Sequence, residues 1–124
     1  MTTATEGAAA PDFVTVGEGA NGRRIAVRAR QANAQGGGAP GLFWLSGFNS
    51  DMAGTKAVAL DAWAAEHGRG CVRFDYSGHG CSEGRFVDGT IGRWLEEALA
   101  VFDRYCKGPT MAVGSSMGGW IALL

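Results

Sequence analysis

Apolar residues follow two different spacings along this chain, and the spacing predicts its elements. Two short runs of alternating character, 13–16 and 24–29, flank glycines and the turn pair Asn21-Gly22, which predicts an antiparallel hairpin. The continuous apolar run 42–45 is typical of a strand that is buried on both faces. Two further runs predict strands of the same kind, 71–74 and 110–113.

Two other segments have the spacing of a helix. The first is 55–67, which Gly68 ends, and its residues at helical intervals are Val58, Ala59, Ala62, Trp63 and Glu66. The second begins after Thr90, which can cap it, and ends before Gly108-Pro109. Its single apolar stripe consists of Ile91, Trp94, Leu95, Ala98, Val101, Phe102 and Tyr105.

The order of these elements predicts an α/β fold. A hairpin is followed by strand, helix, strand, helix, strand and the start of a helix, which indicates a parallel sheet with right-handed crossovers and helices on both faces. Residues 1–12 are rich in threonine and alanine, and they have neither the apolar core of a secretory signal nor the arginines of a transit peptide. We therefore expect a disordered tail over 1–12 and one domain over 13–124.

The composition excludes several classes of function. The chain has 124 residues, of which 46% are hydrophobic and 19% charged, as is ordinary for a globular domain. Its formal net charge of −1 and its lack of a lysine or arginine cluster argue against nucleic acid as a partner. No apolar run approaches the ~20 residues that cross a bilayer. Three cysteines, Cys71, Cys81 and Cys106, have no spacing typical of disulfides or zinc sites and favour a reduced, cytoplasmic location.

The most informative segment is 111–120, which combines a short strand, a G-x-S-x-G turn and the opening of a helix. This layout is that of a nucleophile elbow, in which a sharp turn exposes a serine hydroxyl. The pattern also arises by chance in a chain with 21 glycines, so its context has to support it. Because side chains two residues before and after the serine would collide, Gly114 and Gly118 favour Ser116 as the nucleophile over Ser115.

Two backbone amides are predicted to stabilise the oxyanion that attack by Ser116 would create. In this arrangement one donor is the residue after the nucleophile, here Met117, and the other lies in the loop after the third strand. That loop begins Ser46-Gly47-Phe48, where the glycine permits an unusual backbone angle, so Phe48 is the second predicted donor.

The segment 75–84 suggests other chemistry, which we consider weaker. Its glycines are spaced one residue too far apart for the dinucleotide fingerprint, so no nicotinamide or flavin is expected, and no other cofactor or metal is predicted. His79 could be a general base, but the segment is more typical of a glycine-shaped loop that borders a site. Nothing near Cys81 or Cys106 suggests a lowered thiol pKa.

These motifs together resemble the α/β-hydrolases, and within them the branch of alpha/beta-hydrolase domain-containing protein ten and its bacterial relatives. The resemblance runs from about Leu42 to the end and rests on Gly47-Phe48, on 51–57, on 73–80, on 90–94 and on 114–120. It implies an esterase of acyl thioesters, such as palmitoyl-cysteine, and of acyl glucuronides. By the same resemblance, Ser116 is the nucleophile, and Phe48 and Met117 are the oxyanion donors. Ser46 stands where such loops commonly have proline, which is expected to loosen the loop without removing the donor.

The sequence lacks part of the expected machinery. In this fold the triad runs serine, then aspartate or glutamate, then histidine along the chain, and the residues after Ser116 include no acid and no histidine. We therefore expect a serine esterase or thioesterase, with an ester or acyl-protein substrate, that is inactive as this chain alone. The alternative is a non-catalytic fragment, a binding or assembly piece that a second segment completes. In either case the edge 111–113 is expected to lie open, and no oligomeric state is specified.

Overall fold

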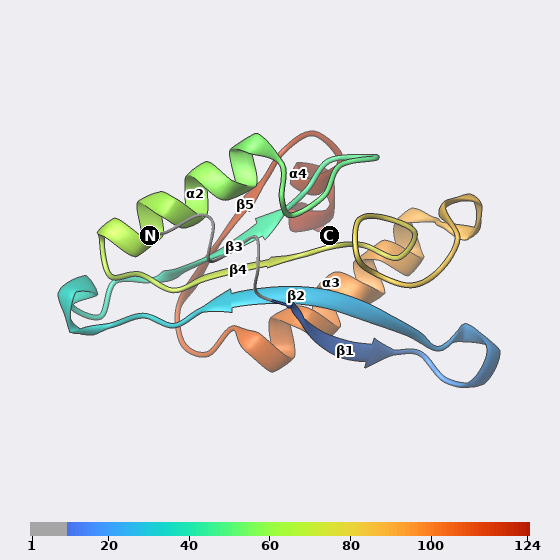
Figure 1. The fold of residues 1–124 in the computed structure, drawn as a ribbon, viewed down its shortest axis with the longest axis horizontal. Coiled ribbons are helices and arrows are strands. Elements are labelled where there is room, and N and C mark those ends of the chain that lie inside the picture. The colour runs from blue at the N-terminus through green and yellow to red at the C-terminus, as the bar shows by residue number, and fades with distance from the viewer. Residues whose placement is uncertain (1–9) are drawn as a thin grey trace.

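The structure is a computed structural model that describes residues 10–124, and its central layer is a five-stranded mixed sheet (Figure 1). The strand order across the sheet is β1-β2-β4-β3-β5. The strands are β1 (Asp12–Val16), β2 (Arg23–Arg30), β3 (Gly41–Leu45), β4 (Cys71–Phe74) and β5 (Thr110–Gly114). Most of the predicted tail lies outside the described residues, but Asp12, its last residue, already belongs to β1.

The strand directions confirm the predicted class. β1 and β2 form the antiparallel hairpin, joined through the short 3₁₀ turn η1 (Gly19–Asn21), and β2 also pairs antiparallel with β4. β3 pairs parallel with β4 on one side and with β5 on the other. α2 connects β3 to β4, and α3 connects β4 to β5, so each crossover between these parallel strands contains a helix.

Helices cover both faces of the sheet (Figure 1). α2 (Thr55–Glu66) packs on one face, against Leu42 and Cys71. α3 (Ile91–Tyr105) and α4 (Met117–Leu123) pack on the other face, where the main core contains Phe43, Phe74 and Ile121. Two more 3₁₀ turns lie in loops, η2 (Ala34–Gly36) and η3 (Phe86–Asp88). Within residues 10–124, none of the helices has the length and apolar character needed to cross a bilayer.

The helix predicted over 55–67 is confirmed as α2, but its buried residues differ from those named at helical intervals. Its buried residues are Ala57, Asp61 and Ala64, whereas Trp63 is 40% exposed. The two alanines let the helix approach the sheet, and the buried Asp61 carboxylate accepts hydrogen bonds from Arg30 at 2.9 and 2.8 Å and lies 3.6 Å from Arg73. Burial alone would raise the pKa of Asp61, but these guanidinium groups outweigh it and hold the pKa below its ordinary value.

α3 follows its predicted stripe and adds a buried charge. Thr90 caps the helix, because its hydroxyl accepts a hydrogen bond from the Arg93 amide at 3.0 Å. Glu97 lies on the apolar face and is fully buried, and its carboxylate accepts from Arg23 Nε at 2.8 Å and from the Ser77 amide at 2.7 Å. The carboxylate therefore fixes the start of the loop that follows β4.

β5 departs from the expectation of a buried strand. It lies at the edge of the sheet, where Met111 and Ala112 are exposed, and the neighbouring helix α4 also exposes apolar side chains. The exposed residues of α4 and the one after it include Trp120, Leu123 and Leu124. Within residues 10–124 the strand pairs on one side only, with β3, which agrees with the predicted open edge.

We predict that the 124-residue chain, expressed alone, self-associates or is partly folded, because β5 offers an unpaired apolar edge. Met111→Lys should increase the monomeric fraction, since a charge on an edge strand opposes strand pairing. Sedimentation velocity and dye binding to exposed apolar surface would measure this. Val87→Lys, at an apolar side chain that is 73% exposed away from the edge, is the control and should have little effect. A sharp, monomeric, cooperative unfolding transition of the unaltered chain would contradict the prediction.

Candidate active site

The site is built around the turn between β5 and α4. Ser116 occupies this turn with φ 56° and ψ −117°, a region that residues with a side chain rarely adopt. The residue is exposed to solvent, and the helix begins at the next residue, Met117. The predicted strand, sharp turn and helix are therefore confirmed, with the serine at the apex.

Close backbone packing explains the glycines on either side. A Cβ atom on Gly118 would overlap the carbonyl oxygen of Leu45 and would lie 2.7 Å from that of Ser46. A Cβ atom on Gly114 would lie 2.5 Å from the carbonyl carbon of Gly118. The turn thus requires glycine at both positions, as the sequence predicted for a nucleophile at Ser116. The neighbouring Ser115 instead bonds back to β3, because its amide donates to the Leu45 carbonyl at 3.2 Å.

The loop after β3 lies against this turn, as predicted. A Cβ atom placed on Gly47 would lie 3.3 Å from the Ser115 carbonyl oxygen and 3.7 Å from Ser116 Cβ. The next residue is Phe48, so both predicted oxyanion donors belong to segments in contact with the serine. Among residues 10–124, neither the Phe48 amide nor the Met117 amide donates a hydrogen bond to another group. Both amides are thus available to a ligand atom.

Ser46, which stands where such loops commonly have proline, is buried and hydrogen-bonded at the start of this loop. The side chain is 1% exposed, and its hydroxyl accepts a hydrogen bond from the Trp44 indole at 2.9 Å. Its carbonyl accepts from the Tyr76 hydroxyl at 3.1 Å. These two bonds anchor the loop at its first residue.

Asp75 anchors the other end of the loop, a role that the sequence did not predict. One carboxylate oxygen accepts from the Met52 amide at 2.8 Å, and the other accepts from the Cys81 amide at 2.8 Å. A side chain on Gly80 would overlap this carboxylate, so the turn that follows β4 is shaped around it. Burial raises the pKa of Asp75, although the two amides act in the opposite direction. The sequence feature that could have indicated this role is an acidic residue directly after a buried strand.

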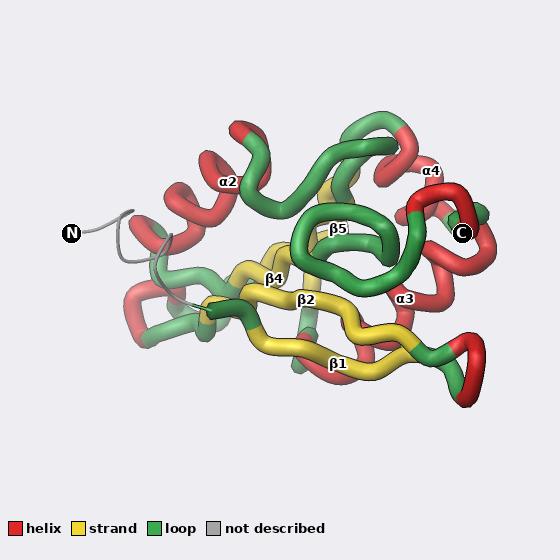
Figure 2. Tube along the Cα trace, turned by 45° about the vertical axis from the view of Figure 1, so that its right-hand side comes forward, coloured by secondary structure: helices red, strands yellow, loops and turns green. Residues whose placement is uncertain are grey.

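His79 lies between these two anchors and is not placed to be a general base. The side chain is buried, its Nε2 atom is 3.1 Å from the Asn49 amide nitrogen, and its Nδ1 atom is 3.0 Å from the Ser77 carbonyl oxygen. Both ring nitrogens are therefore occupied within the protein. The prediction that 75–84 is a loop is confirmed, this loop contacts the loop after β3 through His79, and Figure 2 shows it coiled beside α3.

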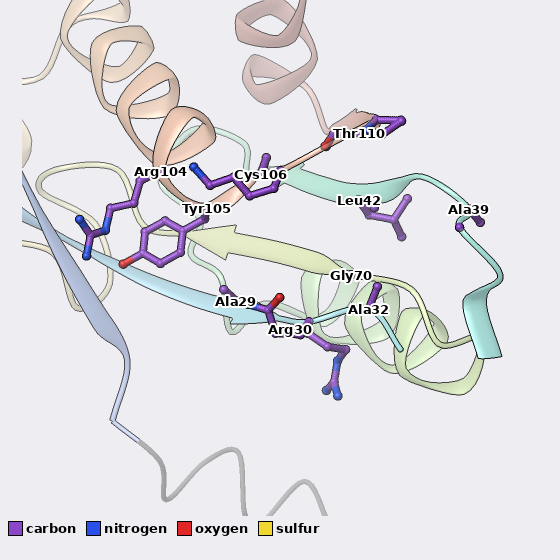
Figure 3. Close-up of a pocket in the computed structure, with 15 residues that line it drawn as sticks. Ala29, Arg30, Ala32, Ala39, Leu42, Gly70, Arg104, Tyr105, Cys106 and Thr110 are labelled. Carbon is purple, nitrogen blue, oxygen red and sulfur yellow. The ribbon is translucent and has the colours of Figure 1, made fainter. Parts of the chain in front are cut away.

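Two cavities flank the parallel strands at opposite ends. A cavity of about 270 Å³ lies at the end with the turn and is lined by residues that include Gly47, Lys56 and Ser115. A cavity of about 370 Å³ lies at the far end, between the end of α3 and the starts of β3 and β5, with Tyr105 and Cys106 on its wall (Figure 3). Catalytic groups in open α/β sheets gather at the carboxyl ends of the strands, which favours the smaller cavity.

The described residues contain no grouping suited to a metal ion, since residues 10–124 bring no three histidine, cysteine or acidic side chains together for one. Two of the thiols, those of Cys71 and Cys106, are not activated. Burial raises the pKa of Cys71 to about 12 and that of Cys106 to about 11. The site therefore offers an exposed, strained serine and the amides of Phe48 and Met117, which make no hydrogen bond within residues 10–124.

Comparison with known proteins agrees with this architecture, although no family model matches the chain. The human protein "Palmitoyl-protein thioesterase ABHD10, mitochondrial" is 42% identical over 87 residues, which are 70% of this chain and 28% of that protein. A crystal structure of a protein from Agrobacterium vitis S4 is 55% identical with a TM-score of 0.86, over 91% of this chain and 42% of that one. The mouse structure "Alpha/beta hydrolase domain-containing protein 10" is 32% identical with a TM-score of 0.78, over 90% and 42%. The chain therefore spans less than half the length of these relatives.

The backbone contact at Gly118 gives a prediction for stability. Gly118→Ala should lower the free energy of unfolding by about 3 kcal/mol or more, because the overlap is with backbone that cannot move aside. Gly119→Ala is the matched control, since its nearest neighbour would be the Gly114 carbonyl oxygen at 3.7 Å. Alanine there should be neutral or stabilise the helix by up to about 1 kcal/mol. Urea unfolding in dilute solution, followed by tryptophan fluorescence, measures both, and equal midpoints for the two variants would contradict the tight turn.

Proposed function

The chain is a relative of the α/β-hydrolases and carries part of their fold, and from this premise we propose that it provides the nucleophile and the oxyanion site of a serine esterase or thioesterase. The observation that carries the proposal is the position of Ser116, strained and exposed at the strand-to-helix turn, with the Gly47 loop packed against it. Relatives named for thioesterase activity share 42% of the aligned residues, which supports the same class of reaction.

The proposed reaction begins when the Ser116 hydroxyl attacks the carbonyl carbon of an acyl ester or thioester. A general base takes the hydroxyl proton, and the carbonyl oxygen becomes an oxyanion that accepts hydrogen bonds from the amides of Phe48 and Met117. Each such donor is worth about 3 kcal/mol in the transition state. Collapse of the intermediate releases an alcohol or thiol and leaves an acyl group on Ser116, which water then removes.

The base and the acid that orients it do not come from the described part of the chain. His79 has both ring nitrogens bonded within the protein, and the other histidine, His67, caps the end of α2. The Asp75 carboxylate accepts hydrogen bonds from the amides of Met52 and Cys81. Since the fold places its acid and its histidine after the serine, we propose that a segment outside residues 10–124 supplies both.

The substrate is proposed to be an acyl ester or an acyl thioester, including acyl groups on protein cysteines. The human relative is named as a palmitoyl-protein thioesterase, and the present chain has an apolar surface beside its proposed donors. The Phe48 side chain is 58% exposed and packs edge-on against Phe86 at 5.2 Å between ring centroids. An acyl chain could lie on such a surface. The cytoplasmic location stays a prediction from the cysteine pattern.

A second candidate is a non-catalytic piece that binds or assembles with another polypeptide. The observation that favours it is the open edge of β5 with its exposed Met111, together with the lack of an available base in residues 10–124. Both proposals require β5 to gain a partner, so they differ in chemistry rather than in assembly.

The test is to express the chain together with the carboxy-terminal segment of the Agrobacterium vitis relative, which is 55% identical over the shared part. We expect hydrolysis of a short p-nitrophenyl ester and labelling by a fluorophosphonate. Ser116→Ala should abolish labelling and leave at most the residual rate, on the order of a thousandfold over water, that an oxyanion site alone supplies.

Ser115→Ala is the matched control, and we expect it to keep both labelling and turnover. Labelling that survives Ser116→Ala would show that another residue is the nucleophile. A folded complex with neither labelling nor turnover would favour the binding or assembly function instead.

A further inference from the structure

We propose that His79 is a positioning residue: its Nε2 lone pair holds the Asn49 amide and thereby orients the preceding Phe48 amide toward the oxyanion. The inference rests on the proposed esterase function for its catalytic meaning. Its structural part, that His79 fixes the loop after β3, can be tested without an activity assay.

The hydrogen bonds of His79 determine its protonation. A backbone carbonyl can only accept, so Nδ1, 3.0 Å from the Ser77 oxygen, carries the hydrogen. A backbone amide can only donate, so Nε2, 3.1 Å from the Asn49 nitrogen, presents its lone pair. The ring is therefore the neutral Nδ1–H tautomer, and it acts as an acceptor toward the loop.

The ring is held firmly enough to position something else. His79 is 5% exposed and packs edge-on against Tyr76, Phe86 and Trp94, with ring centroids 5.7, 5.2 and 5.4 Å away. The Ser77 carbonyl that fixes Nδ1 also accepts from the Trp94 indole at 3.3 Å.

Ser77 is itself fixed through its amide, which donates to the buried Glu97 carboxylate at 2.7 Å. Arg23 Nε in turn donates to that carboxylate at 2.8 Å. The position of Nε2 is thus set by a continuous chain of buried contacts that reaches back to β2.

The Asn49 amide is the point at which His79 holds the loop. Asn49 has φ 58°, a left-handed conformation that asparagine tolerates at some cost. The Ser50 amide closes the turn on the Gly47 carbonyl at 3.2 Å. Gly47 is packed against the serine turn, so His79 fixes the far side of the same turn, and the Phe48 amide lies between the two fixed points. The Phe48–Asn49 peptide carries the Asn49 amide, so loss of the bond to His79 would loosen that peptide and, through Phe48, the adjoining Gly47–Phe48 peptide that carries the Phe48 amide.

A purely structural role would show itself differently. If His79 only filled the core, any side chain of similar size would serve, and a poor replacement would lower stability without a specific loss of turnover. If His79 positions the donor, turnover depends on a hydrogen-bond acceptor in the position that His79 Nε2 occupies. Glutamine and methionine have nearly the same length, but only glutamine places a strong acceptor there.

The experiment compares His79→Met with His79→Gln in the co-expressed protein described above. We expect His79→Met to lower kcat about 10- to 100-fold with KM changed less than about twofold, because the donor acts in the transition state. His79→Gln should recover at least about tenfold of that loss, since it restores the acceptor. His67→Met, the same change at the exposed histidine, should leave kcat as it is. Equal kcat values for His79→Met and His79→Gln would overturn the proposal.

Hydrogen–deuterium exchange of 47–52 separates this inference from the proposed function. The Asn49 amide should exchange faster in His79→Met than in the unaltered protein or in His79→Gln. If the unaltered protein is folded but inactive, the esterase proposal fails, and the exchange result alone decides the role of His79. If His79→Met does not fold, rapid exchange of Asn49 in the folded unaltered protein would still refute the inference.

Discussion

The contact between Gly118 and the end of β3 is the constraint on which the site depends. A Cβ atom at residue 118 would overlap the Leu45 carbonyl oxygen. Only glycine therefore lets the first turn of α4 pack this closely against Leu45 and Ser46. That contact forces the chain to turn sharply at Ser116, which takes a left-handed φ of 56°. The same residues of β3 lead directly into the Gly47 loop. One backbone contact therefore sets both the nucleophile and the loop that faces it.

Strain at this turn has to be offset elsewhere. Positive φ at Ser116 and at Asn49 costs on the order of 1–3 kcal/mol each, and such conformations persist only where the surroundings determine them. The surroundings here are polar and buried: Tyr76, Asp75 and His79 each bond one point of the loop after β3. All three belong to the exit of β4, the strand that neighbours β3 in the sheet. The adjacent parallel strands thus support one another's loops.

The sequence predicts the parts of this arrangement that local chemistry determines. Strand runs, the Thr90 cap and the glycines around Ser116 act within a few residues, so their patterns are visible without a structure. The order of the elements along the chain and the turn at Ser116 are predicted for this reason. The open edge is predicted from the resemblance, and the order of the strands across the sheet is not predicted. The roles of Ser116, Phe48 and Met117 stay predictions, although the structure brings all three together.

The parts that sequence analysis missed depend on partners far along the chain. Asp61 makes α2 pack through a different face from the one that its apolar residues indicate, because Arg30 and Arg73 neutralise it. Glu97 meets Arg23 from the hairpin and Ser77 from the loop. His79 has the residue type of a base, yet its two hydrogen bonds make it an acceptor with a fixed tautomer. The type of a residue indicates which chemistry its side chain can perform, but its partners from distant parts of the chain determine which role it has.

The two halves of the proposed chemistry differ in how they are built. Oxyanion stabilisation uses backbone amides, whose directions follow from β3, β5 and the loops between them, and it needs no titrating group. Proton transfer needs a base within about 3 Å of the serine hydroxyl, and the histidines of residues 10–124 are committed elsewhere. A segment that pairs with the free edge of β5 would lie beside the turn that carries Ser116. Extension of the sheet at β5 and supply of the base would then be one structural event, because the free edge of β5 is the edge next to the serine.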